Sequence, residues 1–181
     1  MNTKKEPSKK SQAEKAPCPD GTEKTLLTTI ETSMAEELKA SAFYKEVSKQ
    51  LKDKAARFKF EVMSDAEQNH YELLKEWCEE KYGLIPKTKK IKEAKIVIIE
   101  KPKKKATYED IIKIIIASEE RACRFYENAA KKTENSEAKK LFEKLAEIEG
   151  KHVDQFKDEF RVITEPSLWC GEEEIPWMLE V

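Results

Sequence analysis

The chain has few of the residues that tight turns, disulfide scaffolds and zinc sites require. It contains four glycines, two histidines and four cysteines (Cys18, Cys78, Cys123 and Cys170), and no two cysteines form a Cys-x-x-Cys pair. The spacing therefore gives no indication of a zinc ribbon or of a four-cysteine iron site. A bridge between Cys18 and Cys170 is the alternative that their positions near the two termini allow, although disulfides are uncommon in the cytosol.

Long apolar runs and an excess of one charge are also absent. No run is long enough to cross a membrane, and the N-terminus lacks the apolar segment of a secretory signal, so we expect a cytoplasmic protein with no membrane partner. The 35 Lys and Arg residues balance 36 Asp and Glu residues. This balance provides no basic field for nucleic acid. The small number of glycines suits long helices joined by few turns.

Apolar residues recur at alternating steps of three and four along four segments, which is the period of helices in a bundle. The pattern begins at Thr25, breaks near residues 52–54, and is predicted to stop at Gly83, a helix terminator. It resumes at Ile112 and breaks again at Asn135–Ser136, which is good N-cap chemistry. We therefore expect an all-α antiparallel four-helix bundle over residues 24–163. Around it we expect a disordered tail at 1–23, a crossover at about 84–106 and a C-terminal extension at 164–181.

The two halves of the bundle repeat one another at an offset of 82 residues. Each half reads Glu-x-x-Ala-x-x-Phe-Tyr and later Phe-x6-Glu-x-x-His. The offset relates identical residues in pairs, among them Glu37 and Glu119, Tyr44 and Tyr126, Phe60 and Phe142, Glu67 and Glu149, and His70 and His152. This pattern indicates a duplicated helical hairpin, with the long crossover joining the two copies.

Six of the repeated residues are predicted to meet inside the bundle. In an antiparallel hairpin, residues equidistant from the turn lie side by side. Glu37 and Glu119, the glutamates outside the Glu-x-x-His motifs, therefore each meet the Glu-x-x-His motif of their own half. Four carboxylates in an apolar core repel one another and are costly to bury, and two divalent cations would balance their charge. The predicted metal ligands are Glu37, Glu67, His70, Glu119, Glu149 and His152.

The positions of these residues also suggest their roles. Glu67 and Glu149 are expected to bridge two metal ions, while Glu37 with His70 and Glu119 with His152 bind one ion each. Ligation that is rich in oxygen, with one imidazole per metal, favours two iron ions, manganese ions or a mixed pair over zinc.

Several further side chains are predicted to lie near this site. Tyr44 and Tyr126 follow Glu37 and Glu119 by two helical turns, in range of a hydrogen bond to a liganding carboxylate. The alternative is that both tyrosines only pack in the core of the bundle. Cys123 borders the site, and its plainer interpretation is a small buried hydrophobe. Glu36 and Glu120 are next to predicted ligands in the sequence, but each points about 100° around the helix from the inward-facing residues, so we expect both to be solvated.

At these residues the chain resembles the rubrerythrin branch of the ferritin-like superfamily, over roughly Thr25 to Val162. The segment from Ser118 to Tyr126 is similar to the third helix of that family, and Met34 to Tyr44 is similar to its first. The resemblance implies a ferritin-like bundle with two iron ions that react with hydrogen peroxide or dioxygen in defence against oxidative stress. We also expect a homodimer or a larger homo-oligomer.

Two departures from the family pattern widen the functional hypotheses. Archetypal rubrerythrins carry a seventh carboxylate where this chain has Ala122, and a rubredoxin domain that has no counterpart here. Electrons must then come from a separate donor, such as a rubredoxin-like protein. Six ligands without the seventh also resemble bacterioferritin, which favours a ferroxidase or iron-handling function as the alternative. A third hypothesis is a non-catalytic helical scaffold whose tails dock a partner.

Overall fold

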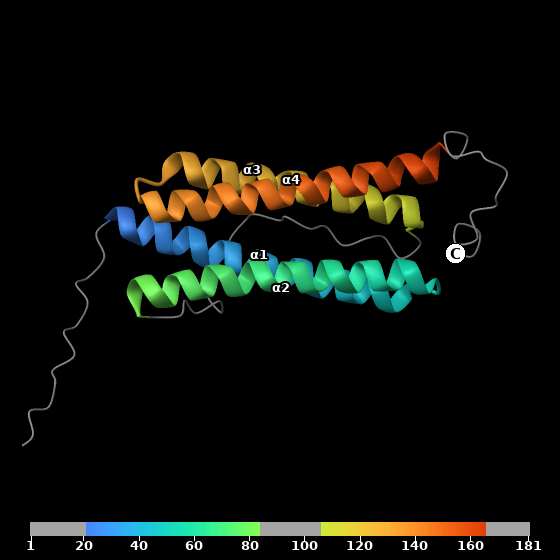
Figure 1. Cartoon of the computed structure of the whole chain (residues 1–181), viewed down its shortest axis with the longest axis horizontal. Coiled ribbons are helices and arrows are strands. Elements are labelled where there is room, and N and C mark those ends of the chain that lie inside the picture. Colours follow the sequence, from blue (N-terminus) through green and yellow to red (C-terminus); the bar gives the residue numbers. More distant parts are fainter. Residues whose placement is uncertain (1–20, 84–105, 166–181) are drawn as a thin grey trace, which may run out of the picture.

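The computed structural model describes residues 21–83 and 106–165, and these form four helices (Figure 1). The helices are α1 (Gly21–Gln50), α2 (Lys54–Tyr82), α3 (Tyr108–Lys132) and α4 (Ser136–Thr164). The described residues contain no strand, so the prediction of an all-α bundle is confirmed. Residues 1–20 of the expected tail, the crossover, most of the expected C-terminal extension, Cys18 and Cys170 lie outside the described residues.

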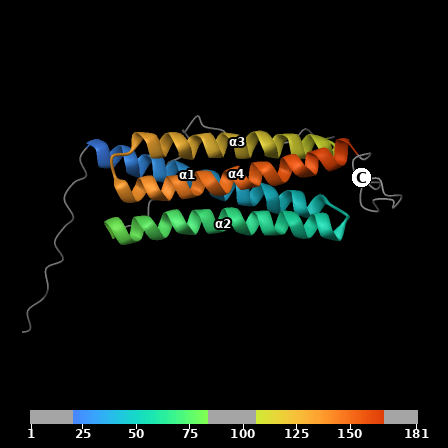
Figure 2. The ribbon, with the colours of Figure 1, turned by 45° about the horizontal axis from the view of Figure 1, so that its top comes forward.

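The four helices lie along one common axis as two hairpins (Figures 1 and 2). α1 packs along α2, and α3 packs along α4, with antiparallel directions within each pair. α2 ends and α3 begins at opposite ends of the bundle. This is the connectivity that a long crossover between the hairpins predicts.

The helix ends are fixed by local side-chain and backbone chemistry, of which the sequence predicts Gly83 and Asn135. Asp53 caps α2, since its side chain accepts the Ala56 N–H at 2.7 Å, and Asn135 caps α4 in the same way. Gly83 ends α2 with a φ of 63°, a left-handed conformation that glycine adopts without strain. The two turns are thereby set, and with them the register of each hairpin.

The core consists of two apolar clusters, one toward each end of the bundle. The first includes Ile30, Met34, Leu74, Tyr126, Phe142 and Leu145, and the second includes Tyr44, Val47, Phe60, Ile112, Ile115 and Phe156. Along every helix, the predicted metal ligands fall between the residues of the first cluster and those of the second. No helix among the described residues has a segment apolar and long enough to pass through a membrane.

Candidate metal centre

The six predicted ligands converge at the centre of the bundle, one or two from each helix. They form two groups of potential ligand atoms, and within each group all atoms lie within 4.8 Å of one another. The first group is Glu37, Glu67, His70 and Glu149; the second is Glu67, Glu119, Glu149 and His152. All six residues are buried.

The first group is centred on one ring nitrogen of His70. His70 Nδ1 lies 3.1 Å from Glu67 Oε2, 3.1 Å from Glu149 Oε1 and 3.4 Å from Glu37 Oε2. A single ring nitrogen carries at most one proton, so it cannot satisfy three carboxylate oxygens. A cation can accept lone pairs from all four atoms at once.

The second group repeats this arrangement around His152. His152 Nδ1 lies 3.3 Å from Glu149 Oε2, 3.4 Å from Glu119 Oε2 and 3.6 Å from Glu67 Oε1. Glu67 and Glu149 therefore each direct one oxygen toward His70 and the other toward His152. The two imidazole rings are stacked with their centroids 5.6 Å apart.

The carboxylates of Glu37 and Glu119 each also accept a hydrogen bond from a tyrosine of the opposite hairpin. Tyr126 Oη donates to Glu37 Oε1, and Tyr44 Oη donates to Glu119 Oε1. In both carboxylates, the other oxygen faces the cluster. The tyrosines thus fix the orientation of one glutamate in each half, in addition to packing in the apolar clusters.

Several buried atoms of the cluster have no hydrogen-bond partner among the described residues. They are Glu67 Oε1, Glu119 Oε2, both carboxylate oxygens of Glu149, and His152 Nδ1. Buried polar atoms are normally satisfied, because leaving them unpaired costs about 1–3 kcal/mol each. All of them face the interior of the two groups of ligand atoms, so the donor set and its geometry fit two metal ions.

Protonation shows how strongly these groups interact. Burial raises the pKa of Glu119 to about 8, and burial together with the charge of Glu149 raises the pKa of Glu67 well above its ordinary value. Burial alone would lower the pKa of the imidazoles and raise that of Glu149. Contacts between these groups outweigh it, raising the pKa of His70 to about 12 and of His152 to about 9, and lowering that of Glu149 to about 2. Without metal ions, protons on the imidazoles would have to supply the positive charge.

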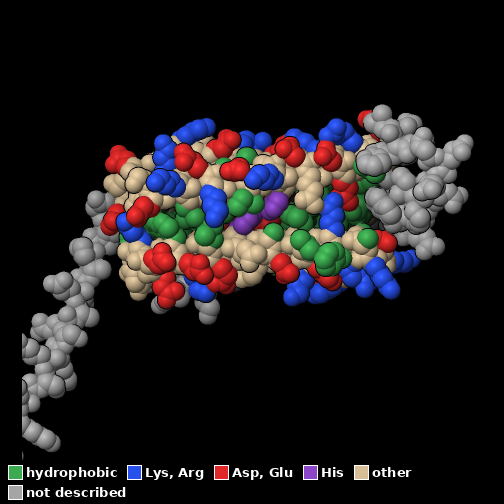
Figure 3. Space-filling view, in the orientation of Figure 1, with side chains coloured by type: hydrophobic (Ala, Val, Ile, Leu, Met, Phe, Trp, Pro, Cys, Tyr) green, Lys and Arg blue, Asp and Glu red, His purple; other side chains and the backbone are tan. Residues whose placement is uncertain are grey.

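The histidines are the part of the cluster nearest to solvent. His70 is 5% exposed and His152 is 9% exposed. In the space-filling view, their side chains are visible on the face that α2 and α4 form, among hydrophobic side chains (Figure 3). The cluster is therefore closest to solvent on the face formed by α2 and α4.

Three other sequence predictions have mixed outcomes. The prediction that Glu36 is solvated is wrong: it is 3% exposed and pairs with Lys39. α1 is buried on all its faces from Thr32 to Glu37, so the direction in which a side chain points from the helix does not decide its exposure there. Glu120 is partly exposed at 35% and pairs with Lys157, while Cys123 is half-buried and its thiol donates to the carbonyl of Ala146.

One partly buried polar network was not predicted. Glu159 pairs with Lys59 and accepts a hydrogen bond from Tyr108, away from the carboxylate cluster. The signal in the sequence was a difference between the repeats, since these three positions hold Trp77, Leu141 and Leu26 in the other copy.

The chain was also compared with known proteins. Residues 29–160 match the family model described as Rubrerythrin. A dodecameric thioferritin, the bacterioferritin-related protein from Bacteroides fragilis, superposes with a TM-score of 0.67 at 18% identity, covering 82% of this chain and 92% of that chain. A hypothetical protein from Pyrococcus furiosus gives 0.57 at 21% identity, covering 79% and 92%. These structures confirm the ferritin-like fold alone. No curated protein matches the chain.

Proposed function

The chain belongs to the rubrerythrin family, and from this premise we propose that it is a di-iron oxidoreductase that reduces hydrogen peroxide or dioxygen. The observation that carries the proposal is the direction of the carboxylate oxygens of Glu67 and Glu149, one toward each histidine. A carboxylate that faces two ligand groups is suited to bridge two ions.

The proposed ligand roles follow from this geometry. Glu67 and Glu149 would bridge the two ions, Glu37 and His70 would hold one, and Glu119 and His152 would hold the other. Two ferrous ions bound in this way would supply the two electrons that convert hydrogen peroxide, with two protons, into two water molecules.

The protein's own side chains would position the reactants and exclude water. Tyr126 and Tyr44 hold one oxygen of Glu37 and of Glu119, so that the other oxygen of each carboxylate stays directed at the site. The apolar clusters on both sides limit water, while the exposed edges of the histidines leave an approach for a small oxidant.

The remaining features of the proposal concern partners. The chain has no Cys-x-x-Cys pair, so the electrons would come from a separate donor rather than from an attached four-cysteine iron site. We also propose that the protein forms a homo-oligomer in the cytoplasm; the similar fold of a dodecameric thioferritin supports this assembly.

Ferroxidase activity is the second candidate, and Ala122 favours it. Ala122 occupies the position of the seventh carboxylate of archetypal rubrerythrins and is itself buried. A site with six ligands has no additional carboxylate to exchange during peroxide reduction. Fe(II) would then be the substrate, and oxidised iron would be retained by the protein.

Metal content and kinetics test these proposals. Protein loaded with Fe(II) under anaerobic conditions should bind about two ions per chain, the stoichiometry of such bundle sites. Peroxide consumption that requires a reductant would support the peroxidase, whereas Fe(II) oxidation with retention of iron would support the ferroxidase. Binding of fewer than about two ions per chain would contradict both.

Substitutions separate an active centre from a structural scaffold. His70→Ala and Glu37→Ala should abolish binding of at least one ion and the associated activity. Glu72→Ala is a matched control, because Glu72 is on α2 beside His70 and forms a surface pair with Lys75. A scaffold would tolerate all three substitutions equally.

A further inference from the structure

The two ends of the bundle differ at positions that the duplication makes equivalent. One end carries a charged and aromatic trio, Lys59, Tyr108 and Glu159, whereas the offset of 82 residues places Leu141, Leu26 and Trp77 at the other end. The carboxylate cluster itself is the same in both halves. The difference therefore marks a feature that belongs to one end and is not required by the fold.

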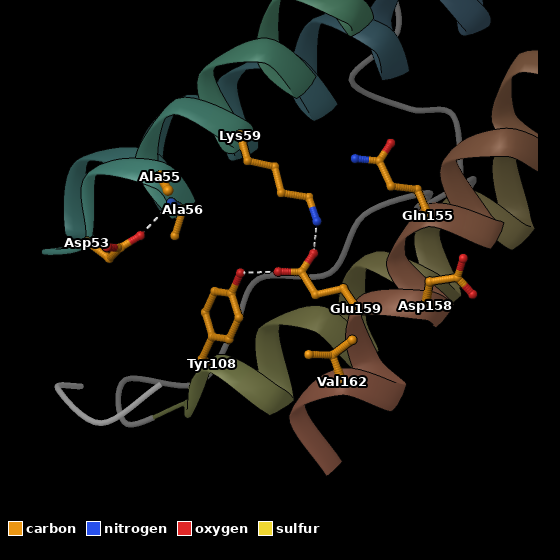
Figure 4. A pocket seen from close by; sticks show the side chains of 9 residues that line it. All are labelled: Asp53, Ala55, Ala56, Lys59, Tyr108, Gln155, Asp158, Glu159 and Val162. Carbon is orange, nitrogen blue, oxygen red and sulfur yellow. Dashed lines mark hydrogen bonds and ion pairs between the residues drawn. The ribbon is translucent and has the colours of Figure 1, made fainter. Parts of the chain in front are cut away.

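The trio lies at a surface pocket of about 350 Å³ between the starts of α2 and α3 and the end of α4 (Figure 4). Glu159 is at its centre, where it accepts a hydrogen bond from the Tyr108 hydroxyl and forms an ion pair with Lys59. The Glu159 side chain is only 9% exposed. Ala55, Ala56 and Val162 supply the apolar part of the lining, and Asp53, Gln155 and Asp158 supply further polar groups. The pocket therefore offers apolar contacts and hydrogen-bonding groups beside the Tyr108 phenol, and its volume suits a small organic molecule.

A continuous series of aromatic rings connects this pocket to the metal centre. The ring of Tyr108 lies 6.2 Å from that of Phe60, and the ring of Phe60 lies 6.1 Å from that of Tyr44. Tyr44 then donates its hydroxyl hydrogen bond to Glu119 of the centre. Both Tyr44 and Phe60 are fully buried.

The other half has the same start but no equivalent end. Tyr126 donates to Glu37, and its ring lies 6.1 Å from that of Phe142. The position equivalent to Tyr108 holds Leu26, an aliphatic side chain that has no phenol to oxidise. Only one of the two aromatic series therefore reaches a surface pocket through an oxidisable side chain.

We propose that Tyr108, Phe60 and Tyr44 form a one-electron route by which a small phenolic reductant in this pocket supplies electrons to the centre. The inference rests on the proposed peroxidase function and names the class of its electron donor. Tyr108 would touch the reductant, Phe60 would bridge the gap, and Tyr44 would pass the electron to the ligand shell.

The chemistry of the trio suits this role. Burial raises the pKa of Tyr108 to about 12, so the phenol keeps its proton at neutral pH and can lose an electron only if a nearby base takes that proton. Glu159 accepts its hydrogen bond and is that base. The reductant then returns one electron and one proton to Tyr108 as its own O–H bond breaks, and Glu159 releases the proton it took to solvent, which replaces the proton consumed at the centre. Two such steps balance the reaction, in which one peroxide and two phenols give two waters and two phenoxyl radicals.

Radical trapping in the iron-loaded full-length protein tests the route without relying on turnover. The protein is treated with hydrogen peroxide and a nitroso spin trap, with no reductant, and the adducts are located by peptide mass spectrometry. We expect an adduct at Tyr108, its loss in Tyr108→Phe, and its suppression when guaiacol, a simple phenol, is added. Adducts only at other tyrosines or tryptophans would overturn the proposal.

The duplication supplies a matched pair of variants. Phe60→Leu interrupts the route, and Phe142→Leu makes the same change at the equivalent buried position of the other half. We expect Phe60→Leu to lose the Tyr108 adduct per peroxide consumed and Phe142→Leu to retain it. Equal labelling in both variants would overturn the route.

Metal content and peroxide consumption, measured in the same samples, keep the two proposals apart. Wild-type protein that consumes peroxide but gives no adduct at Tyr108 would overturn the route alone. Wild-type protein that binds iron but consumes no peroxide would overturn the proposed peroxidase function, and the route with it.

Discussion

Replacing Glu119 by glutamine should stabilise the metal-free protein and reduce the further stabilisation that metal ions provide. Burial raises the pKa of Glu119 to about 8, so at pH 7 the folded protein holds a proton that the unfolded chain, with an ordinary pKa of 4.5, releases. Because the folded pKa is the higher one, this carboxyl destabilises the fold increasingly as the pH rises from 4.5 to 8. Holding the proton about 2.5 pH units above 4.5 costs about 3 kcal/mol.

Glutamine has the shape of the protonated carboxyl without this cost. The metal-free Glu119→Gln protein should therefore be more stable than wild type by about 3 kcal/mol at pH 7. With metal, this advantage should largely disappear, because the amide cannot supply an anionic oxygen. Each site at a hundredfold excess of ligand over its Kd contributes about 2.7 kcal/mol, and the variant should lose at least one such contribution.

Urea unfolding followed by circular dichroism measures both effects. With a chelator present, the midpoint should rise by about 1–3 M, given m-values of about 1–3 kcal/mol/M. With Fe(II) under anaerobic conditions, the wild type should gain more stability than the variant. The next residue provides the control, because Glu120 is partly exposed and pairs with Lys157 at 2.7 Å; Glu120→Gln should change stability by less than about 0.5 kcal/mol in both conditions. Metal-free Glu119→Gln protein that is no more stable than Glu120→Gln would refute the reasoning.

Three other predictions concern protons, a hydrogen bond and a helix end. Metal affinity should rise with pH, because His70 and His152, whose pKa values are about 12 and 9, must release their protons to bind an ion; calorimetry in buffers of different ionisation enthalpy would measure the protons released. Tyr126→Phe removes the donor to Glu37 Oε1, so the metal-free protein should lose about 1–3 kcal/mol in urea unfolding, while an unchanged midpoint would contradict this contribution. Gly83→Ala should destabilise the protein by about 1 kcal/mol in the same assay, because alanine is strained at a φ of 63°. The added methyl meets open space, so no clash adds to this cost.

Much of the fold and the position of the centre could be predicted from the sequence. The helical period, the cap residue Asn135 and the offset of 82 residues are local or repeated features that can be recognised directly in the sequence. The turn positions then predict which residues lie at one level within each hairpin. This is why the sequence alone predicts one place for the six groups.

Contacts between the hairpins could not be predicted in the same way. Tyr44 follows Glu37 on one stripe, yet it bonds to Glu119, because the packing of one hairpin on the other decides which carboxylate a long side chain reaches. Glu36 was wrongly expected in solvent for a related reason, since a periodic pattern identifies the inner face of a helix but not what covers its outer face.

The equivalence of the two halves places the centre on an approximate dyad. A single hairpin carries two glutamates and one histidine, and a tyrosine that reaches the glutamate of its neighbour, so two identical hairpins would together complete the cluster. The present chain is such a pair fused end to end. In this tandem arrangement the two halves need not be identical: the six groups of the centre match between them, whereas Lys59, Tyr108 and Glu159 at one end have Leu141, Leu26 and Trp77 as their equivalents at the other.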